Sequence, residues 1–176
     1  MEFLYEDVSC KSVMVKQLIN VMKLKEGEEM IIRELVIKDF NEWAKLRHAL
    51  WPYHTLEYLK TEMKDVYKRF KLDYMFYVAE DNGSLVGFIE LSIHETALGC
   101  KTKNVGFIEG WYVKPEYRQR GIGKLLVAKG EAWAIDNECK EMASDTTERY
   151  PISPIAHKSL GYEEVDTPLN YRKSLC

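Results

Sequence analysis

The sequence has few cysteines and no long apolar run, and each of these absences excludes a kind of protein. The four cysteines form no CxxC pair and have no histidine cluster beside them, so neither a zinc site nor a redox dithiol is indicated. Reduced thiols in the cytoplasm are the simpler interpretation. No run of about 18 apolar residues occurs, and residues 1–16 lack the basic start and apolar core of a signal peptide. We therefore expect no membrane segment, no export and no metal.

A positive charge excess is also lacking. The formal net charge is −3, and residues 1–29 carry six acidic and four basic side chains, which leaves 22 acidic and 21 basic ones in the remainder. Bulk binding to nucleic acid requires cations that neutralise phosphates, so this nearly neutral body argues against a DNA-binding or RNA-binding protein. Any charged ligand must be recognised by a local site.

The composition is that of one folded domain. The chain has 176 residues, of which 46% are hydrophobic and 30% charged, and this length suits a single domain. We interpret residues 1–29 as an N-terminal extension of uncertain order, either a genuine arm or an artefact of the assigned start. Within it, Val13, Val15, Leu18, Ile19 and Met22 have the spacing of one helix face. The domain itself is predicted to span residues 30–176.

Strand and helix patterns alternate through this domain. Apolar alternation and turn residues predict strands at 30–37, 74–80, 85–94, 106–113, 142–146, 162–165 and 170–175. Helical spacing predicts helices at 40–51, 56–70, 121–139 and 154–160. Asp39 and Glu42 have the spacing of a capping box for the first helix, and Asn82-Gly83 predicts a hairpin turn. The fold class is therefore α/β or α+β around one mixed sheet.

The segment from Val113 to Leu126 joins a predicted strand to a predicted helix through a basic loop. The loop contains Arg118, Arg120, Gly121 and Gly123. Glycines let the main chain approach a ligand, and successive N–H groups with the positive end of a helix dipole favour a diphosphate there. An isolated Gly-x-Gly would more often mark a simple turn, but the arginines and the strand–helix context favour an anion site. Such a site needs no metal.

Two common nucleotide motifs do not fit this loop. A P-loop would require glycine where Arg118 stands and Ser or Thr where Leu125 stands. A dinucleotide GxGxxG motif that begins at Gly121 would require a third glycine where the chain has Leu126. The loop is therefore neither of these.

The sequence of this loop resembles a motif of a known protein family. Arg118-x-x-Gly121-x-Gly123, the preceding Val-x-Pro-x-Tyr-Arg and the later Leu160-Gly161-Tyr162 resemble the acetyl-CoA-binding motif of the GNAT N-acetyltransferases. Shorter matches in order across residues 30–176 resemble, more narrowly, the aminoglycoside 6'-N-acetyltransferases. These matches are Leu50-Trp-Pro52, Phe107-x-Glu109-Gly110, Arg118-Gln-Arg-Gly121, Glu141-Met-Ala-Ser-Asp-Thr146, His157-x-x-Leu-Gly161 and Tyr171-Arg-Lys173.

The resemblance implies a GNAT-like single domain with a mixed, mostly antiparallel sheet and helices on both faces. The sheet would be splayed between its fourth and fifth strands, here 106–113 and 142–146, with the pantetheine of acetyl-CoA along the fourth strand and its pyrophosphate on the loop amides. The implied cofactor-binding residues are Tyr112, Val113, Arg118, Gln119, Arg120, Gly121, Ile122, Gly123 and Lys124. Relatives of this type also imply a homodimer, by analogy alone.

Two carboxylates are candidates for the acceptor side. Amine attack on a thioester needs a deprotonated, well-placed nitrogen and stabilisation of the oxyanion and thiolate. Glu109 lies in the strand beside the implied cofactor edge, and Asp145 lies at the end of the next strand, where ligands of α/β sheets bind. By resemblance both bind the amino sugar, and each is either a base or a positioning group. Glu109 could instead be surface decoration, and Asp145 a turn or helix cap.

Further candidates complete the implied site. Many GNAT enzymes have a tyrosine acid four residues before the glycine of the Leu-Gly-aromatic signature, where this chain has His157, so His157, Tyr171 or solvent remains open as the acid. Trp51 and Tyr53 are candidate walls of the acceptor site, or simply core and loop anchors. On a regular pleat Glu109 and Trp111 would share one face of their strand with Phe107 and Val113, although Gly110 warns of an irregularity.

These features favour acetyl transfer from acetyl-CoA to the 6'-amino group of an aminoglycoside, which confers antibiotic resistance. A GNAT enzyme that acts on a polyamine or a protein amine is one alternative. A non-catalytic acyl-CoA-binding module is another, and the pair Glu109 and Asp145 argues against it, because a pure binder has no use for two carboxylates beside the acetyl group.

Overall fold

The computed structural model describes residues 21–23, 29–166 and 170–175 of the chain. Met22 lies in a short strand, β1 (Val21–Lys23), rather than in the helix predicted for the extension. The other four residues of that predicted helix lie outside the described residues. The division into an extension and a domain of residues 30–176 stays a prediction, although β1 pairs with the first strand of the domain.

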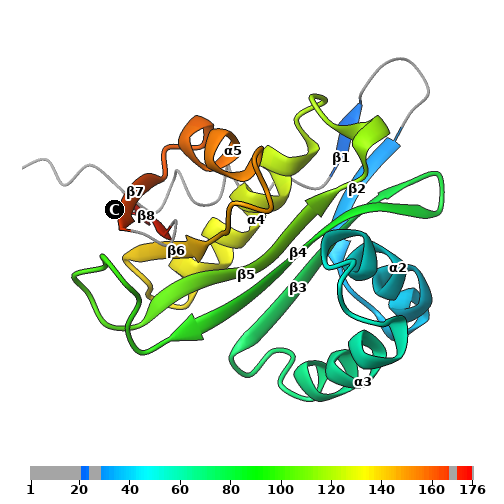
Figure 1. Cartoon of the computed structure of the whole chain (residues 1–176), viewed down its shortest axis with the longest axis horizontal. Helices are drawn as coiled ribbons and strands as arrows, with labels where there is room; N and C mark the ends of the chain where they lie inside the picture. The colour runs from blue at the N-terminus through cyan, green and yellow to red at the C-terminus, as the bar shows by residue number, and fades with distance from the viewer. Residues whose placement is uncertain (1–20, 24–28, 167–169, 176) are drawn as a thin grey trace, which may run out of the picture.

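The described strands form one sheet (Figure 1), with the order β1-β2-β3-β4-β5-β6-β8-β7. After β1, the strands are β2 (Glu29–Glu34), β3 (Tyr74–Asp81), β4 (Ser84–His94), β5 (Val105–Val113), β6 (Glu141–Asp145), β7 (Glu163–Asp166) and β8 (Asn170–Ser174). Neighbouring strands are antiparallel except β5 and β6, which run parallel. Asn82 and Gly83 both have positive φ in the β3–β4 turn, as the hairpin prediction requires.

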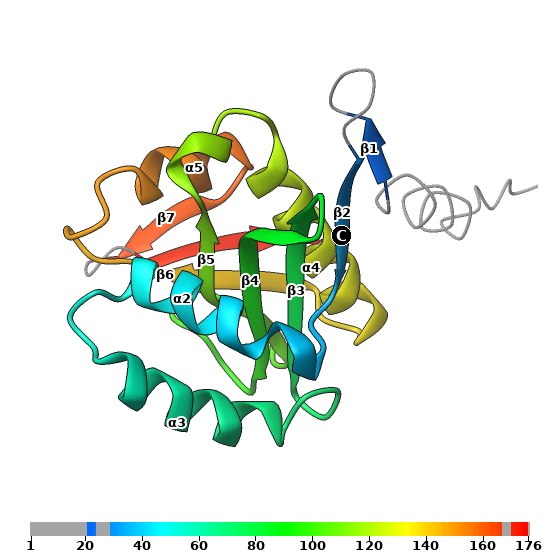
Figure 2. The ribbon, with the colours of Figure 1, turned by 90° about the vertical axis from the view of Figure 1, so that its right-hand side faces the viewer.

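The helices cover both faces of the sheet (Figure 2). Helices α2 (Phe40–Leu50) and α3 (Leu56–Tyr67) pack on one face, α4 (Ile122–Asp136) packs on the other, and α5 (Ser153–Ser159) lies beside β7. Single 3-10 turns, Ile37–Asp39 and Pro115–Tyr117, precede α2 and the basic loop. The predicted mixed α/β class and the helices on both faces are confirmed, with boundaries shifted by a few residues.

The predicted capping box is wrong. Asp39 places no side-chain oxygen on the α2 amides, because its carboxylate accepts hydrogen bonds from the Arg33 guanidinium, at 2.6 and 2.9 Å, and from the Val36 N–H. Glu42 instead accepts from the Leu85 N–H at 2.8 Å and so ties α2 to β4. Arg33 of β2 binds Asp39 and Leu85 of β4 binds Glu42, so neither side chain caps α2.

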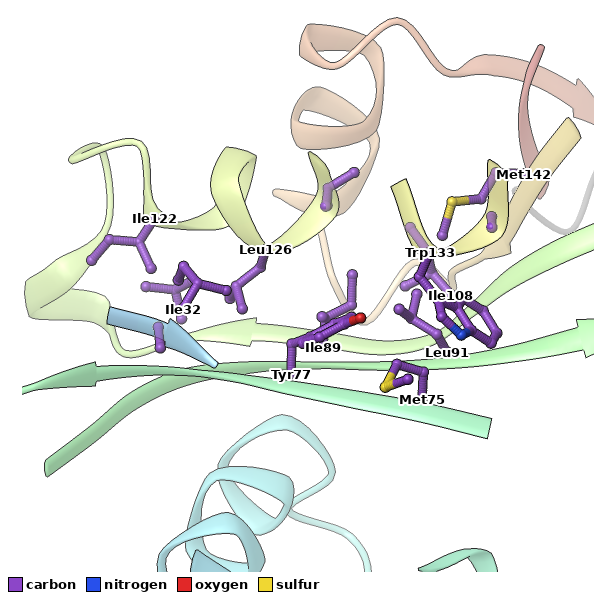
Figure 3. Close-up of a cluster of buried hydrophobic side chains, with 14 of the residues drawn as sticks. Ile32, Met75, Tyr77, Ile89, Leu91, Ile108, Ile122, Leu126, Trp133 and Met142 are labelled. Carbon is purple, nitrogen blue, oxygen red and sulfur yellow. The ribbon is translucent and has the colours of Figure 1, made fainter. Parts of the chain in front are cut away.

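Each face of the sheet buries its own apolar cluster. The cluster under α4 includes Ile89, Leu91, Ile108, Leu126 and Trp133 (Figure 3). The cluster under α2 and α3 is rich in aromatic rings, among them Trp43, Phe76 and Phe88. Burial of these side chains at roughly 25 cal/mol per Å² is the main force that holds the helices on the sheet. The rigid sheet between the clusters positions the groups described next.

The sheet opens between β5 and β6. These strands pair only at Gly106, Phe107 and Ile108 of β5, opposite Met142, Ala143 and Ser144 of β6. Beyond Ile108, β5 continues to Val113 without pairing to β6. The predicted splay is therefore confirmed, and the two strands are the fifth and sixth of the sheet because β1 precedes them.

A β-bulge changes the faces of β5. Glu90 of β4 lies opposite Gly110, whereas the next residue, Leu91, lies opposite Ile108, so Glu109 is the extra residue. The prediction that Phe107, Glu109, Trp111 and Val113 share a face is therefore wrong. Phe107 and Glu109 contact residues of β4 on the α2 side, whereas Trp111 and Val113 pack in the cluster under α4. Gly110 was the correct sign of this irregularity.

Candidate functional site

The basic loop forms a turn of backbone N–H groups at the start of α4. Gln119 and Gly121 have φ values of 62° and 81°, so left-handed residues alternate with the others along the turn. Gly121 precedes the first helical residue and offers no capping side chain. The first N–H groups of a helix have no partner within it, and here they are left for a ligand. An anion suits them because the helix dipole is positive at this end.

Side chains of the loop fix it to β5 and surround it with positive charge. Arg118 donates from Nε to the Val113 carbonyl at 2.9 Å and lies over the Tyr112 ring at 5.6 Å. The Arg120 guanidinium lies 5.2 Å from the centre of the Tyr117 ring. Arg118, Arg120 and Lys124 are all exposed. Their charges can therefore reach a phosphate held by the amides.

The two glycines of the loop are required for different physical reasons. Gly121 needs glycine because its φ is positive, a conformation that costs other L-residues about 1–2 kcal/mol. Gly123 needs glycine for packing, because a Cβ there would lie 2.7 Å from Cζ2 of Trp111. Close approach to a ligand, the reason given from sequence for both, stays a prediction, and the Trp111 contact is a second reason for glycine at 123.

A matched pair of glycine variants tests this turn. Gly121→Ala is expected to raise the dissociation constant of acetyl-CoA several-fold, because relief of the strained φ reorients the amides at the start of α4. Gly83 has the same φ of 81° in the β3–β4 hairpin. Gly83→Ala should therefore cost a similar amount of stability, about 1 kcal/mol, with no change in affinity. Calorimetric titration and thermal unfolding of both variants measure this, and equal affinity losses would contradict a specific role of the turn.

The edge of β5 beyond Ile108 is open on the side of the splay. Tyr112 and Val113 lie on this stretch, between Glu109 and the basic loop. An unpaired strand edge offers alternating N–H and C=O groups to any extended amide chain. The open edge of β5 therefore extends from the basic loop to Glu109.

Glu109 is held by two donors from β4. Its Oε1 accepts from Ser92 Oγ at 2.5 Å and from His94 Nε2 at 2.9 Å. Asp145 is exposed at the end of β6, and the pKa of its carboxyl is raised by reduced hydration and by the charge of Glu109. Ile108 of β5 pairs with Ser144 of β6, so the two predicted carboxylates, which follow these residues, lie at the same point of the sheet. Sequence reasoning missed Ser92 and His94, whose only signal was polar residues two apart in an apolar strand.

His157 and Tyr171 lie buried and stacked. Their ring centroids are 4.6 Å apart with planes 14° from parallel, and Trp111 meets His157 edge-on at 5.8 Å. His157 Nδ1 lies 2.8 Å from the Ser153 carbonyl, so this nitrogen carries the proton, and burial lowers the pKa of the imidazole. Burial raises the pKa of Tyr171. Neither His157 Nε2 nor the Tyr171 hydroxyl has a hydrogen-bond partner among the described residues.

Trp51 and Tyr53, here called the aromatic wall, are the residues predicted to line the acceptor site. The Trp51 ring covers Gly110 so closely that a Cβ there would lie 2.7 Å from its Cη2. Tyr53 is exposed, and the Arg149 guanidinium lies 5.1 Å from the centre of its ring. Trp51 also packs against the α2-side cluster, so it belongs to both the core and the wall.

A buried ion pair lies beneath this wall. Arg47 Nε is 2.9 Å from Glu90 Oε1, and the same oxygen accepts from Trp43 Nε1 at 2.9 Å. The Arg47 guanidinium also reaches Glu62 at 3.0 Å and lies 4.8 Å from the centre of the Trp51 ring. Burial raises the pKa of Glu90 to about 7 although Arg47 and Trp43 lower it. This pair was not anticipated from the sequence.

The described part of the chain contains neither a cluster of metal-ligating side chains nor a helix that could span a membrane. Within residues 21–23, 29–166 and 170–175, histidine, cysteine and acidic side chains do not gather in threes where one ion could bind. In the same part of the chain, every helix is too short or too polar to cross a bilayer.

A splayed sheet, an amide-lined turn and a pair of carboxylates beside the open strand edge define a protein of the acyltransferase class. A model of the acetyltransferase (GNAT) family matches residues 43–162. The chain belongs to this family. Aminoglycoside N(6')-acetyltransferase type 1 of Salmonella typhimurium is 36% identical over 146 residues, which cover 82% of this chain and 99% of that protein.

Another relative and two solved structures are also similar to this chain over most of its length. The protein of the same name from Acinetobacter baumannii is 31% identical over 157 residues, covering 89% of this chain and 99% of that protein. The solved structure of aminoglycoside N-acetyltransferase AAC(6')-Iy in complex with CoA has a TM-score of 0.75 at 34% identity, covering 80% of this chain and 92% of that one. AAC(6')-Iy with the bisubstrate analogue CoA-S-monomethyl-acetylneamine has a TM-score of 0.72 at 34% identity, covering 78% and 92%.

Proposed function

We propose that this protein transfers the acetyl group of acetyl-CoA to the 6'-amino group of aminoglycoside antibiotics and thereby confers resistance to them. The observation that carries the proposal is the pair Glu109 and Asp145 beside the open edge of β5, at the far end from the amide turn. Relatives named aminoglycoside N(6')-acetyltransferase cover most of the chain, and one relative is solved with an analogue that joins CoA to an aminoglycoside.

The proposed cofactor site runs from the turn along β5. Amides of Gln119 to Lys124 would bind the pyrophosphate, and Tyr112 and Val113 would pair with the pantetheine arm. The unpartnered His157 Nε2 and Tyr171 hydroxyl fit a ligand that brings polar atoms to this end of the splay. No metal is needed, because the turn supplies N–H groups and the loop supplies cations.

The proposed acceptor site uses charge and position. Glu109 and Asp145 would attract the 6'-ammonium, and its proton would pass to one of them or to solvent. The neutral nitrogen then attacks the thioester carbonyl carbon, a C–N bond forms and the C–S bond breaks. The nitrogen gives up its second proton as the amide forms, and the thiolate takes one proton. Of the two acid candidates, Tyr171 has a hydroxyl proton with no partner among the described residues, whereas the only proton of neutral His157 is on Nδ1, bound to the Ser153 carbonyl. Trp51 and Tyr53 would contact the sugar rings.

A thiol-release assay tests the proposal. We expect turnover of acetyl-CoA with a kanamycin-type aminoglycoside that has a 6'-amino group, and none with the matched compound that has a 6'-hydroxyl. Mass spectrometry of the product should place one acetyl group on that amine. Turnover with polyamines or peptides but with no aminoglycoside would favour the alternative acceptor class. Acetyl-CoA binding without any turnover would leave a non-catalytic binding module.

Location and assembly are also proposals. By analogy with the family alone, we propose a cytoplasmic homodimer that acts on a small molecule, with neither nucleic acid nor membrane as a partner. Light scattering of the purified full chain measures its mass, and one copy per particle would contradict the dimer.

A further inference from the structure

One oxygen of Glu109 is bound by two donors and the other is left open. Ser92 and His94 lie two residues apart on β4, and both bind Oε1. The second oxygen, Oε2, has no hydrogen-bond donor among the described residues. The side chains of His94 and Glu109 are 38% and 30% exposed, so an acceptor molecule can reach them from solvent.

The tautomer of His94 follows from its partner. A carboxylate only accepts hydrogen bonds, so the Nε2 atom 2.9 Å from Glu109 must carry a proton. The ring of His94 is stacked on Phe107 at 4.4 Å with planes 5° apart, and this stacking fixes the plane in which the N–H points. His94 is therefore a rigid donor aimed at one carboxylate oxygen.

Glu109 needs such a donor because the bulge leaves it out of the regular ladder. Its side chain has three rotatable bonds, and each staggered state that it visits points the carboxylate elsewhere. Two donors on Oε1 select one of these states. Ile108 of β5 pairs with Ser144 of β6, so Glu109 and Asp145 each follow a paired residue and lie at the same point of the sheet.

We propose that His94, with Ser92, is the positioning residue that turns Oε2 of Glu109 towards the ammonium group of the acceptor. The inference rests on the proposed function, because it takes the acceptor to be an amine. It assigns no reaction step to His94 itself, which acts through Glu109.

Kinetics of three variants test this role. His94→Ala is expected to raise the KM of the aminoglycoside and lower its kcat/KM by about 10-fold or more, the effect of one hydrogen bond to a charged group. His94→Gln retains an N–H donor and should restore most of the loss. Ser92→Ala removes the other donor and should lower kcat/KM in the same sense. The KM of acetyl-CoA and the melting temperature should stay at the wild-type values in all three.

Two kinetic outcomes would overturn the inference. Wild-type kinetics in His94→Ala would show that Ser92 alone suffices. A His94→Gln variant as slow as His94→Ala would show that the imidazole itself, rather than a donor, is required. A melting temperature lowered in step with the activity would reduce His94 to a structural role.

A second measurement does not depend on turnover. Nitrogen NMR of the imidazole should find the proton on Nε2 of His94 in the wild-type protein, and its signal should shift in Glu109→Gln. An unprotonated Nε2 would overturn the inference even in an active enzyme. Failure of the proposed function is distinct, since the wild type would then bind acetyl-CoA, show the Nε2 proton and acetylate no aminoglycoside.

Discussion

Glu109→Gln is expected to lower kcat/KM for an aminoglycoside by about 10²-fold to 10⁴-fold, with the affinity for acetyl-CoA unchanged. The amide keeps the shape of the side chain, and its oxygen can still accept from Ser92 and His94. The variant loses the negative charge that attracts the ammonium group and one of the groups proposed to take its proton. Steady-state thiol release gives kcat/KM, and calorimetric titration gives the acetyl-CoA affinity.

Glu95→Gln is the matched control for this variant. Glu95 is next to His94 in the chain but is exposed and pairs with Lys103 at 3.1 Å, away from Glu109. Glu95→Gln removes the same charge from the same region. The kcat/KM of this variant should stay within about twofold of wild type, because exposed ion pairs contribute little free energy. Equal losses in the two variants would mean that net charge, rather than Glu109, attracts the acceptor. A loss of acetyl-CoA affinity in Glu109→Gln would mean that Glu109 acts in the cofactor site and not in the acceptor site.

The largest expected effect on stability comes from the buried pair beneath the aromatic wall. Arg47→Met is expected to lower the free energy of unfolding by about 3–5 kcal/mol, because Glu90 is left buried without its cation. For a chain of this length that corresponds to a fall in melting temperature of roughly 10 °C. Met retains much of the volume of Arg, so the packing against Trp43 and Trp51 changes little.

This loss should depend on pH in a defined direction. Burial already raises the pKa of Glu90 from its ordinary 4.5 to about 7, and removal of Arg47 raises it further. When a carboxyl has a higher pKa in the folded state than in the unfolded state, the protein loses unfolding free energy as the pH rises from the unfolded-state pKa to the folded-state pKa. The deficit of Arg47→Met relative to wild type should therefore be larger at about pH 8 than at about pH 5.

The double variant Arg47→Met/Glu90→Gln provides the control. It leaves no buried charge unpaired, and a neutral pair is often as stable as the ion pair it replaces. We expect it to recover at least half of the lost unfolding free energy and to show a pH-independent deficit. Thermal and urea unfolding at the two pH values measure this. A double variant as unstable as Arg47→Met would mean that the deficit comes from packing rather than from the Glu90 charge.

The turn that precedes α4 could be predicted from the sequence because its causes are local, whereas its anion-binding role stays a prediction. Gly121 adopts a backbone conformation that glycine favours, and the helix that follows begins within one residue of the predicted start. The Asn82-Gly83 hairpin follows from the same preference. The splay between β5 and β6 was expected only through the family resemblance, and the short pairing at residues 106–108 confirms it.

The acceptor side could be predicted only in part. The sequence named Glu109 and Asp145 and left open how they point, because the direction of Glu109 depends on a bulge opposite β4. Ser92 and His94 precede Glu109 by 17 and 15 residues, and their hydrogen bonds exist only once the β4–β5 register is set. The partner of Gly123 was likewise hidden, since Trp111 reaches it across the α4-side cluster.

The sequence by itself determined the order of the elements, the turn of N–H groups at the start of α4 and the residue types available for chemistry. Backbone preferences and hydrophobic periodicity act between close neighbours in the chain, so they can be read from it directly. Only the tertiary structure decided which oxygen of Glu109 is bound, which proton His157 carries and which cation pairs with Glu90. Those outcomes depend on strand register and burial, which join residues that are far apart in the chain and remove them from water together.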